Sequence, residues 1–597
     1  MQSRYFSRWL GALAIVLFPF VAAFLLAVFI GTPQPFKTTT LMVSSQLLSD
    51  PFLQLPSPNS VRVVWFTEFR GSDHRVVYGD RLENEVSART TKLTRVREDK
   101  DSRITPPPDW VVYRDVWRHE AEITGLQRDR RLPYRVVSTK ETGEEIGSDI
   151  FSLAPTPSAG KPLKILLTSD HQLMPMTTAN LQKVEETIGK VDAVFLAGDL
   201  INIPDRASEW FDSNAGNAFF PALQGRARYT LKKNDVETVY KGGQLIQHAP
   251  LFPAIGNHEV MGRFSLETGL NFQYGDAYPQ NQAEENYQKS QATINPGNDP
   301  QVKQAWVKTN SFNTDTYEEI FTLPQSDSGG EKYYAVTFGD IHLIVLYVTN
   351  IWRSPTLEDW AVSRYRERSQ DLNNPERWGY GQLIFEPITP DSQQYQWLVK
   401  ELKKNEFLNA KYKIVMFHHP PHTLGDNIVP PYTNPRQMIV SSPDGTIRSV
   451  RYEYPLDDDY IQRYLEPLFN EAGVQLVYYG HSHLWNRFQN KQGVNFLESS
   501  NVGNTYGAFL GEKKRPIPQG FQENYVAEGD PNGLEPILPA IAPLKDENNR
   551  SLPYISSNDI SVFSILDTER GTISSYRFDT TQPNSDVIKF DEFSLLP

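Results

Sequence analysis

The chain has 597 residues, too many for one hydrophobic core, so two folded domains with insertions are expected. Its formal net charge of -13 argues against binding to a nucleic-acid backbone, which needs a basic surface. The absence of cysteine excludes disulfide bridges and thiolate metal sites.

The N-terminal residues 1–31 contain an uncharged apolar run from 9 to 30, preceded by Arg4 and Arg8. A spanning helix needs about 20 residues, whereas a signal-peptide core has about 7–15, and residues 28–31 make a poor cleavage site. The run therefore predicts a single-pass anchor, with the arginines in the cytoplasm and the rest periplasmic or extracellular. A cleaved signal, giving a secreted protein, and a buried hydrophobic helix are the alternatives.

The next part of the chain changes from a tether to short strands. Residues 32–48 are polar with two prolines and are expected to form the tether. From 49 to 155, short alternating runs such as 61–66 and 74–78 are separated by turn residues. This pattern is typical of a small all-β sandwich. It has no catalytic spacing, so we interpret it as a packing or spacer module.

From 162 to 597 the pattern is that of an α/β domain. The runs 163–168 and 193–197 are continuously apolar, as strands buried on both faces are. Between them Leu181, Val184 and Ile188 recur at helical spacing, which predicts a β-α-β unit. Later strands are predicted at 413–417, 474–479, 560–566, 572–578 and 587–595.

Three segments of this domain are longer than its connections require. Loops of such length are usually lids, binding loops or disordered segments. The sequence does not distinguish a lid from a plain insertion for these three segments. Arginines in the second segment could contact a substrate phosphate or form a solvated charged face. The segments are 260–316, 352–390 and 503–557, and the arginines are Arg353, Arg364 and Arg366.

Five short polar clusters lie in a fixed order, each at the end of an apolar run. They are Ser169-Asp170-His171-Gln172, Gly198-Asp199, Gly256-Asn257-His258-Glu259, His418-His419-Pro420 and Gly480-His481-Ser482-His483. In α/β sheets functional groups collect at the carboxyl ends of strands. Carboxylate, amide and imidazole ligands without thiolates suit a pair of Mn, Fe or Zn ions. One carboxylate must bridge such a pair, and Asp199 is the natural candidate. The glycines before Asp199, Asn257 and His481 are expected to let the backbone turn sharply.

The ordered clusters resemble the calcineurin-like metallophosphoesterase superfamily. Residues 50–54, 119–126, 333–342 and 480–487 extend the resemblance to purple acid phosphatases. The implied fold is α+β and multidomain. It has an all-β sandwich like fibronectin type III and a four-layer α/β/β/α metallophosphoesterase domain, and the apolar run adds the N-terminal transmembrane helix expected above.

The resemblance also implies a role for each matching residue. Asp170 and His483 would hold a first metal ion, Asp199 would bridge, and Asn257, His418 and His481 would hold a second. His258 would act on the leaving group or the phosphoryl oxygens. The two ions are divalent or trivalent Mn, Fe or Zn.

The implied reaction is hydrolysis of a small phosphomonoester by direct attack of a hydroxide that bridges the metals. The alternative is a phosphodiesterase or nucleotide hydrolase with the same centre. A less favoured hypothesis is a non-catalytic binding protein on a phosphatase scaffold. The oligomeric state does not follow from the sequence.

Two positions depart from the pattern. Purple acid phosphatases have a tyrosine where this chain has Asn202, so ferric iron and a purple colour are not specified. Many superfamily members have histidine where this chain has Gln172. The carbonyl oxygen of Gln172 could ligate a hard ion, or the side chain could only hydrogen-bond nearby.

The remaining histidines near the clusters need separate interpretation. Neighbours on a strand face opposite sides, so only one of His418 and His419 is expected to be a ligand. The family pattern selects His418. His419 is then expected to lie behind the ligands and contact them, or to pack in the core. His171 and His422 could touch substrate or a ligand, and His342 is expected in the core.

Overall fold

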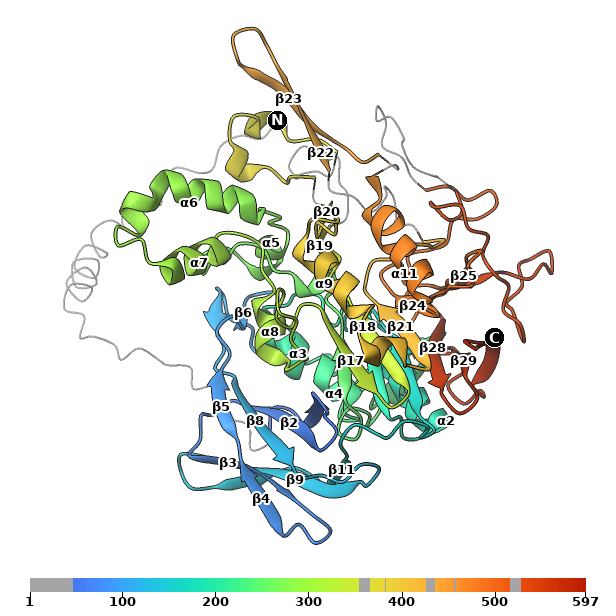
Figure 1. The fold of residues 1–597 in the computed structure, drawn as a ribbon. Helices are drawn as coiled ribbons and strands as arrows, with labels where there is room; N and C mark the ends of the chain where they lie inside the picture. The colour runs from blue at the N-terminus through green and yellow to red at the C-terminus, as the bar shows by residue number, and fades with distance from the viewer. Residues whose placement is uncertain are drawn as a thin grey trace, which may run out of the picture. The chain divides into compact units, whose positions relative to one another are not determined.

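The computed structural model describes residues 47–353, 365–381, 383–425, 435–455, 458–515 and 528–596. Ser45–Pro597 forms one compact unit (Figure 1). Contacts between the β-rich N-terminal region and the larger α/β region hold this unit together. One example is the buried Tyr134 hydroxyl, which donates to the carbonyl of Gln247 at 2.8 Å.

The single-pass membrane location expected from the N-terminal run is not supported. Residues 1–31, on which that expectation rests, lie outside the described residues. Within the ranges given above, no helix has both the length and the apolar character needed to cross a bilayer. The assignment to a membrane with an extracytoplasmic catalytic domain is therefore corrected.

The N-terminal region consists of two antiparallel sheets that share one core. Trp65 from the first sheet packs with Val76 and Tyr134 from the second, and all three are fully buried. The alternation read from the sequence is confirmed, since β2 covers the predicted run 61–66. The first sheet is β1 (Phe52–Gln54), β2 (Ser60–Thr67), β8 (Trp117–Thr124) and β5 (Arg89–Lys92). The second is β10 (Glu145–Gly147), β9 (Leu132–Thr139), β3 (Asp73–Tyr78) and β4 (Asn84–Ser87), with β11 (Phe151–Leu153) beside β9.

Two larger sheets form the centre of the molecule. The six-stranded sheet has the order β16 (Leu251–Pro253), β13 (Ala193–Leu196), β12 (Lys164–Thr168), β28 (Ile560–Asp567), β29 (Thr572–Asp579) and β30 (Ile588–Ser594). The seven-stranded sheet has the order β17 (Tyr334–Phe338), β18 (Ile341–Val345), β21 (Tyr412–Met416), β24 (Leu476–Tyr479), β26 (Asn495–Ser499), β25 (Trp485–Gln489) and β27 (Tyr554–Ile555). Strands β12, β13 and β16 run parallel, as do β18, β21, β24 and β26. The predicted strands are confirmed with boundaries shifted by one or two residues.

Successive side chains of β21 point alternately into two different hydrophobic cores. Ile414 and Met416 belong to the same core as Ile165 and Leu167 of β12, so the two sheets pack face to face. Val415 points the other way, into a second core with helices α9 (Gln393–Glu401) and α11 (Glu466–Ala472). Helix α2 (Thr177–Ile188) packs its Leu181 and Val184 on the six-stranded sheet. Helix α11 is preceded by a π-helical turn, Ile461–Leu465.

Shorter elements fill the connections. The first long segment is largely helical, with α5 (Leu270–Tyr274), α6 (Gln280–Ile294), α7 (Pro300–Thr309) and α8 (Asp315–Ile320). Short elements elsewhere in the chain are β6 (Arg97–Glu98), β7 (Val112–Tyr113), α3 (Ala207–Phe211), α4 (Phe219–Leu223), β14 (Tyr229–Lys233), β15 (Val236–Tyr240), η1 (Asn257–Glu259), β19 (Thr349–Trp352), β20 (Leu383–Phe385), α10 (Asn405–Leu408), β22 (Arg436–Ser441) and β23 (Ile447–Glu453).

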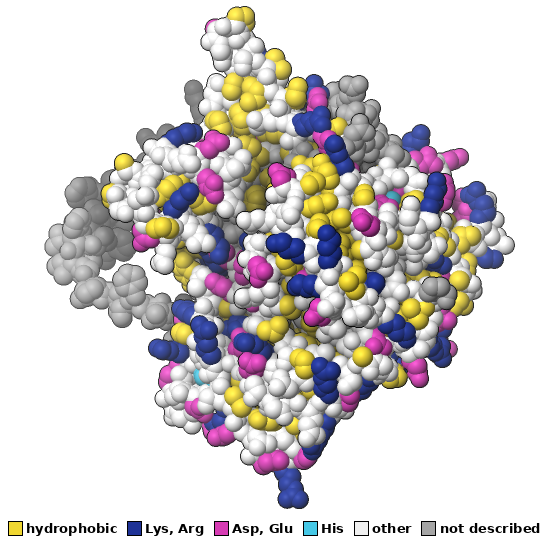
Figure 2. Space-filling model, viewed as in Figure 1, with side chains coloured by type: hydrophobic (Ala, Val, Ile, Leu, Met, Phe, Trp, Pro, Cys, Tyr) yellow, Lys and Arg dark blue, Asp and Glu magenta, His cyan; other side chains and the backbone are white. Residues whose placement is uncertain are grey.

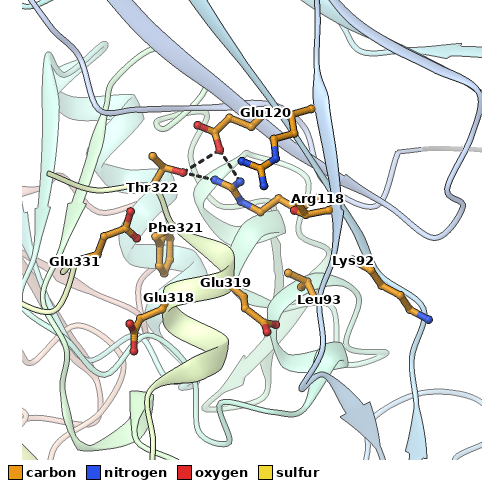
Figure 3. A pocket seen from close by; sticks show the side chains of 11 residues that line it. Lys92, Leu93, Arg118, Glu120, Glu318, Glu319, Phe321, Thr322 and Glu331 are labelled. Atoms are coloured by element: carbon orange, nitrogen blue, oxygen red, sulfur yellow. Dashed lines mark hydrogen bonds and ion pairs between the residues drawn. The ribbon is translucent and has the colours of Figure 1, made fainter. Parts of the chain in front are cut away.

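The surface carries charges of both signs. On the face drawn in Figure 2, basic and acidic side chains are interspersed rather than gathered into one basic patch. A cavity of about 280 Å³ lies between β5, β8 and the segment that follows α8. Figure 3 shows Arg118 in its wall, paired with Glu120 and Thr322, and glutamates along the other side. No predicted metal ligand of the described chain lines this cavity.

Candidate metal centre

The predicted ligands lie at the carboxyl ends of neighbouring strands from both central sheets. Asp170 follows β12, Asp199 follows β13, and Asn257 begins η1 after β16. His418 follows β21, and His481 with His483 follow β24. Because the two sheets pack face to face, these strand ends meet at one edge of the molecule's core. All six side chains are buried.

One group of ligand atoms surrounds His418. Its Nε2 atom lies 3.2 Å from Oδ2 of Asp199 and 3.2 Å from Oδ1 of Asn257. The same Nε2 atom lies 3.1 Å from Nδ1 of His481. Its Nδ1 atom faces the carbonyl of Ala197 at 2.8 Å, and because a carbonyl only accepts, Nδ1 carries the proton. The neutral imidazole therefore presents its Nε2 lone pair to the other three side chains, as a metal-bound histidine does.

A second group of ligand atoms surrounds Asp170. Its Oδ1 atom lies 3.2 Å from Nε2 of His483, and its carboxylate accepts the backbone N–H of His481. Asp199 belongs to this group as well, since one ligand atom from each of Asp170, Asp199 and His483 lies within 4.8 Å of the others. The same limit holds for Asp199, His418 and His481. Asp199 is thus common to both groups.

The spacing of these atoms fits a metal ion. With bonds of about 2.1 Å, two ligands at neighbouring positions of an octahedron or tetrahedron lie about 3.0–3.4 Å apart. The separations around His418 and between Asp170 and His483 fall in this range. In the metal-free protein a proton takes the place of the cation. Burial lowers the pKa of His418, but the Asp199 carboxylate overcomes this and raises it to about 9.

Gln172 lies in the centre and has one unsatisfied atom. Its Nε2 donates to Oδ2 of Asp199 at 2.9 Å, while its buried Oε1 accepts no hydrogen bond. A buried carbonyl oxygen without a partner is costly, and a hard metal ion would satisfy it. Turning the amide over would point Oε1 at the Asp199 carboxylate, which only a cation between them could stabilise. Both orientations therefore fit Gln172 as a ligand, and the set as a whole fits a metal centre.

The glycines of the clusters have two different roles. Gly198 adopts a left-handed conformation with φ of 92°, as expected for a sharp turn. Gly256 has an ordinary φ of -101°, but a Cβ there would lie 2.3 Å from Oδ1 of Asp199. At Gly480 a Cβ would lie 2.3 Å from Oδ2 of Asp170. The expected sharp turn is therefore confirmed only for Gly198, and the other two glycines leave room for the carboxylates.

Glu259 organises the loops that carry the ligands, a role that sequence reasoning missed. Its buried carboxylate accepts the backbone N–H groups of Asp199, Leu200 and Gly256 at 2.7–2.9 Å. Burial, with the nearby charge of Asp199, raises the pKa of Glu259 to about 8. The only available sequence signal was its position as the last residue of the Gly256-Asn257-His258-Glu259 cluster.

A second buried glutamate, Glu498 on β26, supports the loop that carries His481 and His483. It accepts the backbone N–H of Ser482 at 2.9 Å and the hydroxyl of Thr423 at 2.7 Å. Burial raises the pKa of Glu498 to about 8. No pattern in the sequence marked this residue.

His258 faces the centre without being one of its ligands. Its Nδ1 donates to the carbonyl of Asn202 at 2.8 Å, so Nε2 is the atom that gains or releases a proton. Nε2 lies 4.0 Å from Oδ2 of Asp199, and the side chain is 21% exposed. Burial lowers the pKa of His258 below its usual value. Asn202, at the position where purple acid phosphatases have tyrosine, orients His258 and also donates its amide to the carbonyl of Gln172.

The other candidate histidines lie around the centre. The ring of His419 packs on those of His481 and Phe385, with centroids 4.1 and 4.7 Å away. It therefore lies against a candidate ligand. His171 is buried beside the hydroxyl of Thr168 at 2.8 Å, and burial lowers its pKa to about 4.

His422 and His342 are held by partners outside the candidate ligand set. His422 pairs with Asp530 at 2.8 Å, which ties the third long segment to the loop after β21. A contact with substrate stays a prediction for both His171 and His422. His342 is buried as expected, with its Nδ1 atom beside the Thr337 hydroxyl.

Arg353 does not reach toward a substrate as one reading of the sequence suggested. Its guanidinium is buried and donates to backbone carbonyls, including those of Asn257 and Val260. Arg366 is exposed, and its backbone pairs with that of Arg451 in an isolated antiparallel β-bridge. Arg364 lies outside the described residues.

Comparison with known proteins shows the family of the chain. The family model described as calcineurin-like phosphoesterase matches residues 163–484, which is more than half of the chain. No curated protein sequence matches the chain significantly.

Three solved structures illustrate the range of similar folds, and at their low identity we transfer no substrate or residue role from them. A purple acid phosphatase from yellow lupin (Lupinus luteus) seeds is 13% identical with a TM-score of 0.49, over 91% of this chain and 74% of the lupin chain. PhoD is 12% identical with a TM-score of 0.43, over 92% and 90% of the two chains. GAP50, the anchor in the inner membrane complex of Plasmodium, is 10% identical with a TM-score of 0.30, over 72% and 89%.

Proposed function

The chain belongs to the calcineurin-like phosphoesterase family, and we propose that it hydrolyses phosphomonoesters at a centre of two metal ions. The observation that carries this proposal is the place of Asp199 in both groups of ligand atoms. A carboxylate common to two adjacent ligand sets is suited to bridge two cations. Asp170, Gln172 and His483 would hold one ion, and Asn257, His418 and His481 the other.

The donor set favours Mn, Fe or Zn. Imidazole nitrogens together with carboxylate and amide oxygens suit these ions, whereas the chain has no thiolate to offer. Asn202 occupies the position at which a phenolate would favour ferric iron, so ferric iron is not specified and we expect the metallated protein not to be purple. When bound, the ions would supply Lewis acidity at the phosphoryl oxygens and lower the pKa of the attacking water.

His258 provides the proton chemistry in this proposal. Its Nε2 atom, the one not occupied by Asn202, faces the centre and is partly open to solvent. A protonated Nε2 would donate to the leaving-group oxygen as the ester bond breaks. The neutral form would instead accept a hydrogen bond from a phosphate hydroxyl.

The substrate is proposed to be a small phosphomonoester, bound by local positive charge. The net charge of -13 cannot attract an anion at long range. The buried guanidinium of Arg353, which donates to the carbonyl of Asn257 next to His258, would contribute to this local charge. Residues 49–155 and 162–597 are proposed as the β-rich spacer and the catalytic domain of the enzyme.

The test compares a phosphomonoester with a phosphodiester after controlled metal loading. The full chain is stripped with a chelator and assayed with Mn, Fe, Zn or buffer alone, on p-nitrophenyl phosphate and bis(p-nitrophenyl) phosphate. The proposal expects metal-restored turnover with higher kcat/KM for the monoester. Higher kcat/KM for the diester would assign the centre to a phosphodiesterase. Metal binding without turnover of either compound would support a non-catalytic binding protein.

A further inference from the structure

We propose that Tyr274 and Arg353 are positioning residues that hold His258 in its catalytic orientation, an inference that rests on the proposed function. Tyr274 ends helix α5 in the first long segment, and Arg353 directly follows β19. Tyr274 lies 16 residues and Arg353 lies 95 residues after His258 in the sequence. The structure brings the phenol ring, the guanidinium and the imidazole together beside the metal centre.

The first observation is a pair of ring contacts made by Tyr274. The centroids of the Tyr274 and His258 rings are 5.1 Å apart with an interplanar angle of 28°, which is a stacked arrangement. The guanidinium carbon of Arg353 lies 3.5 Å from the centroid of the same Tyr274 ring. The phenol ring therefore packs on the imidazole and is itself fixed by the arginine.

The second observation is where the N–H groups of Arg353 are directed. Its Nε donates to the carbonyl of Tyr274 at 2.7 Å. Its Nη1 donates to the carbonyl of Asn257 at 3.2 Å, and its Nη2 to that of Val260 at 3.0 Å. One guanidinium thus ties the end of α5 to the residue before His258 and to the second residue after it.

The third observation is the unusual environment of the Arg353 charge. The residue is only 7% exposed, and its hydrogen bonds in the described chain go to carbonyl oxygens and none to a carboxylate. Burying a cation without a carboxylate in direct contact is costly, and the nearby charge of Asp199 offsets only part of that cost, so packing alone is a poor explanation. A positive charge beside the site of an anionic substrate is a better one.

Together these contacts fix the His258 ring from two directions. The bond from Nδ1 to the carbonyl of Asn202 sets its rotation, and the stack on Tyr274 sets its plane. Nε2 is then held toward the centre. Without the stack, a side chain that is 21% exposed could turn toward solvent and lose its alignment with the leaving group. The first long segment would then be part of the active site and not a plain insertion.

The test uses substrates that differ in their need for a proton donor. Phenyl phosphate has a poor leaving group, whereas 2,4-dinitrophenyl phosphate has a good one that departs without protonation. We expect Tyr274→Leu and Tyr274→Ala to lower kcat for phenyl phosphate by about 10-fold or more with KM changed little. The loss for the dinitrophenyl ester should be under about 3-fold. Tyr274→Phe, which keeps the ring, should retain wild-type kcat, and Arg353→Lys should be impaired because a lysine cannot reach three carbonyls at once.

Two further measurements separate positioning from general damage. In a His258→Ala background, Tyr274→Leu should cause no further loss, because the group that it positions is already absent. In the metal-free protein with labelled histidine, NMR should show one Nδ1–H tautomer for His258 and a mixture in Tyr274→Leu. Equal losses on both esters, additive losses with His258→Ala, or an unchanged tautomer would each overturn the inference. A wild-type protein that hydrolyses neither ester would overturn the proposed function itself, and this role with it.

Discussion

His418 and Asp199 approach each other with the Nε2 and Oδ2 atoms 3.2 Å apart, although the strands that they follow belong to different sheets. The carbonyl of Ala197 holds one proton of His418 on Nδ1, so the Nε2 atom faces the carboxylate and must share either a second proton or a metal ion with it. Two electron-rich atoms in a buried site need a cation between them. This relationship underlies the proposed metal centre and the predictions that follow from it.

Gln172→Ala should weaken one of the two metal sites and leave the other intact. The proposed function assigns Gln172, whose amide contacts Asp199 and whose Oε1 is unsatisfied, to the ion held by Asp170 and His483, so its loss should remove a donor from that ion only. We expect a titration with Mn to show one site about 10- to 100-fold weaker. Gln301→Ala, on the surface of α7, is the matched control and should titrate as wild type. Equal weakening of both sites, or of neither, would contradict the assignment.

Gly256→Ala should abolish metal binding, because the new Cβ would lie 2.3 Å from Oδ1 of Asp199. The backbone at Gly256 can accept a side chain, so the effect comes from the lost space and not from strain. Gly297→Ala is the control, since a Cβ there meets nothing within 4 Å. Metal content and turnover should fall to background in Gly256→Ala and stay at wild-type values in Gly297→Ala. A Gly256→Ala protein that retains its metal would show that the Asp199 loop is free to move.

Glu259→Gln should lower both stability and metal affinity. The carboxylate accepts three backbone N–H groups, and an amide can accept with one oxygen only while its NH₂ group faces those donors. We expect a loss of about 1–3 kcal/mol in the free energy of unfolding, measured by urea denaturation of the metal-free protein above pH 8, where Glu259 is ionised. Glu285→Gln, exposed on α6, should unfold as wild type does. An unchanged stability in Glu259→Gln would mean that these bonds do not hold the loops together.

Several features of the site could be predicted from the sequence because they depend on local pattern. Continuous apolar runs marked β12, β13, β21 and β24, and the polar residues after them marked the strand ends. The positions of Tyr274 and Arg353 beside His258 could not be predicted in this way. They lie in long segments without periodicity, and only the packing of α5 and β19 against η1 brings them to the centre. The role of Glu259 was hidden because hydrogen bonds to backbone N–H groups leave no spacing signal.

The pair formed by His422 and Asp530 should make stability depend on pH in the alkaline range. Burial alone would lower the pKa of His422, but the carboxylate of Asp530, together with Glu466, raises it to about 9 from 6.5. The folded pKa lies above the unfolded one, so the stabilisation is fully present below pH of about 6.5 and is lost as pH rises through about 9. Its size is roughly 3 kcal/mol.

The check is the difference in unfolding free energy between the wild type and His422→Gln, measured by urea denaturation across that range. It should shrink as pH rises from about 6.5 to 9. For His248→Gln the difference should stay flat, because burial lowers the pKa of His248 to about 4. A flat difference for His422→Gln would mean that the pair contributes no charge-dependent stability.

The most direct test of the central claim is Mn binding measured together with electron paramagnetic resonance and turnover. The chelator-treated wild-type chain should bind two Mn ions per chain, show the spectrum of an exchange-coupled pair, and hydrolyse p-nitrophenyl phosphate. Asp199→Asn should lose both the coupling and the turnover, because Asp199 belongs to both ligand groups. A single Mn ion per chain, or an Asp199→Asn protein with the coupled spectrum and full turnover, would contradict the account.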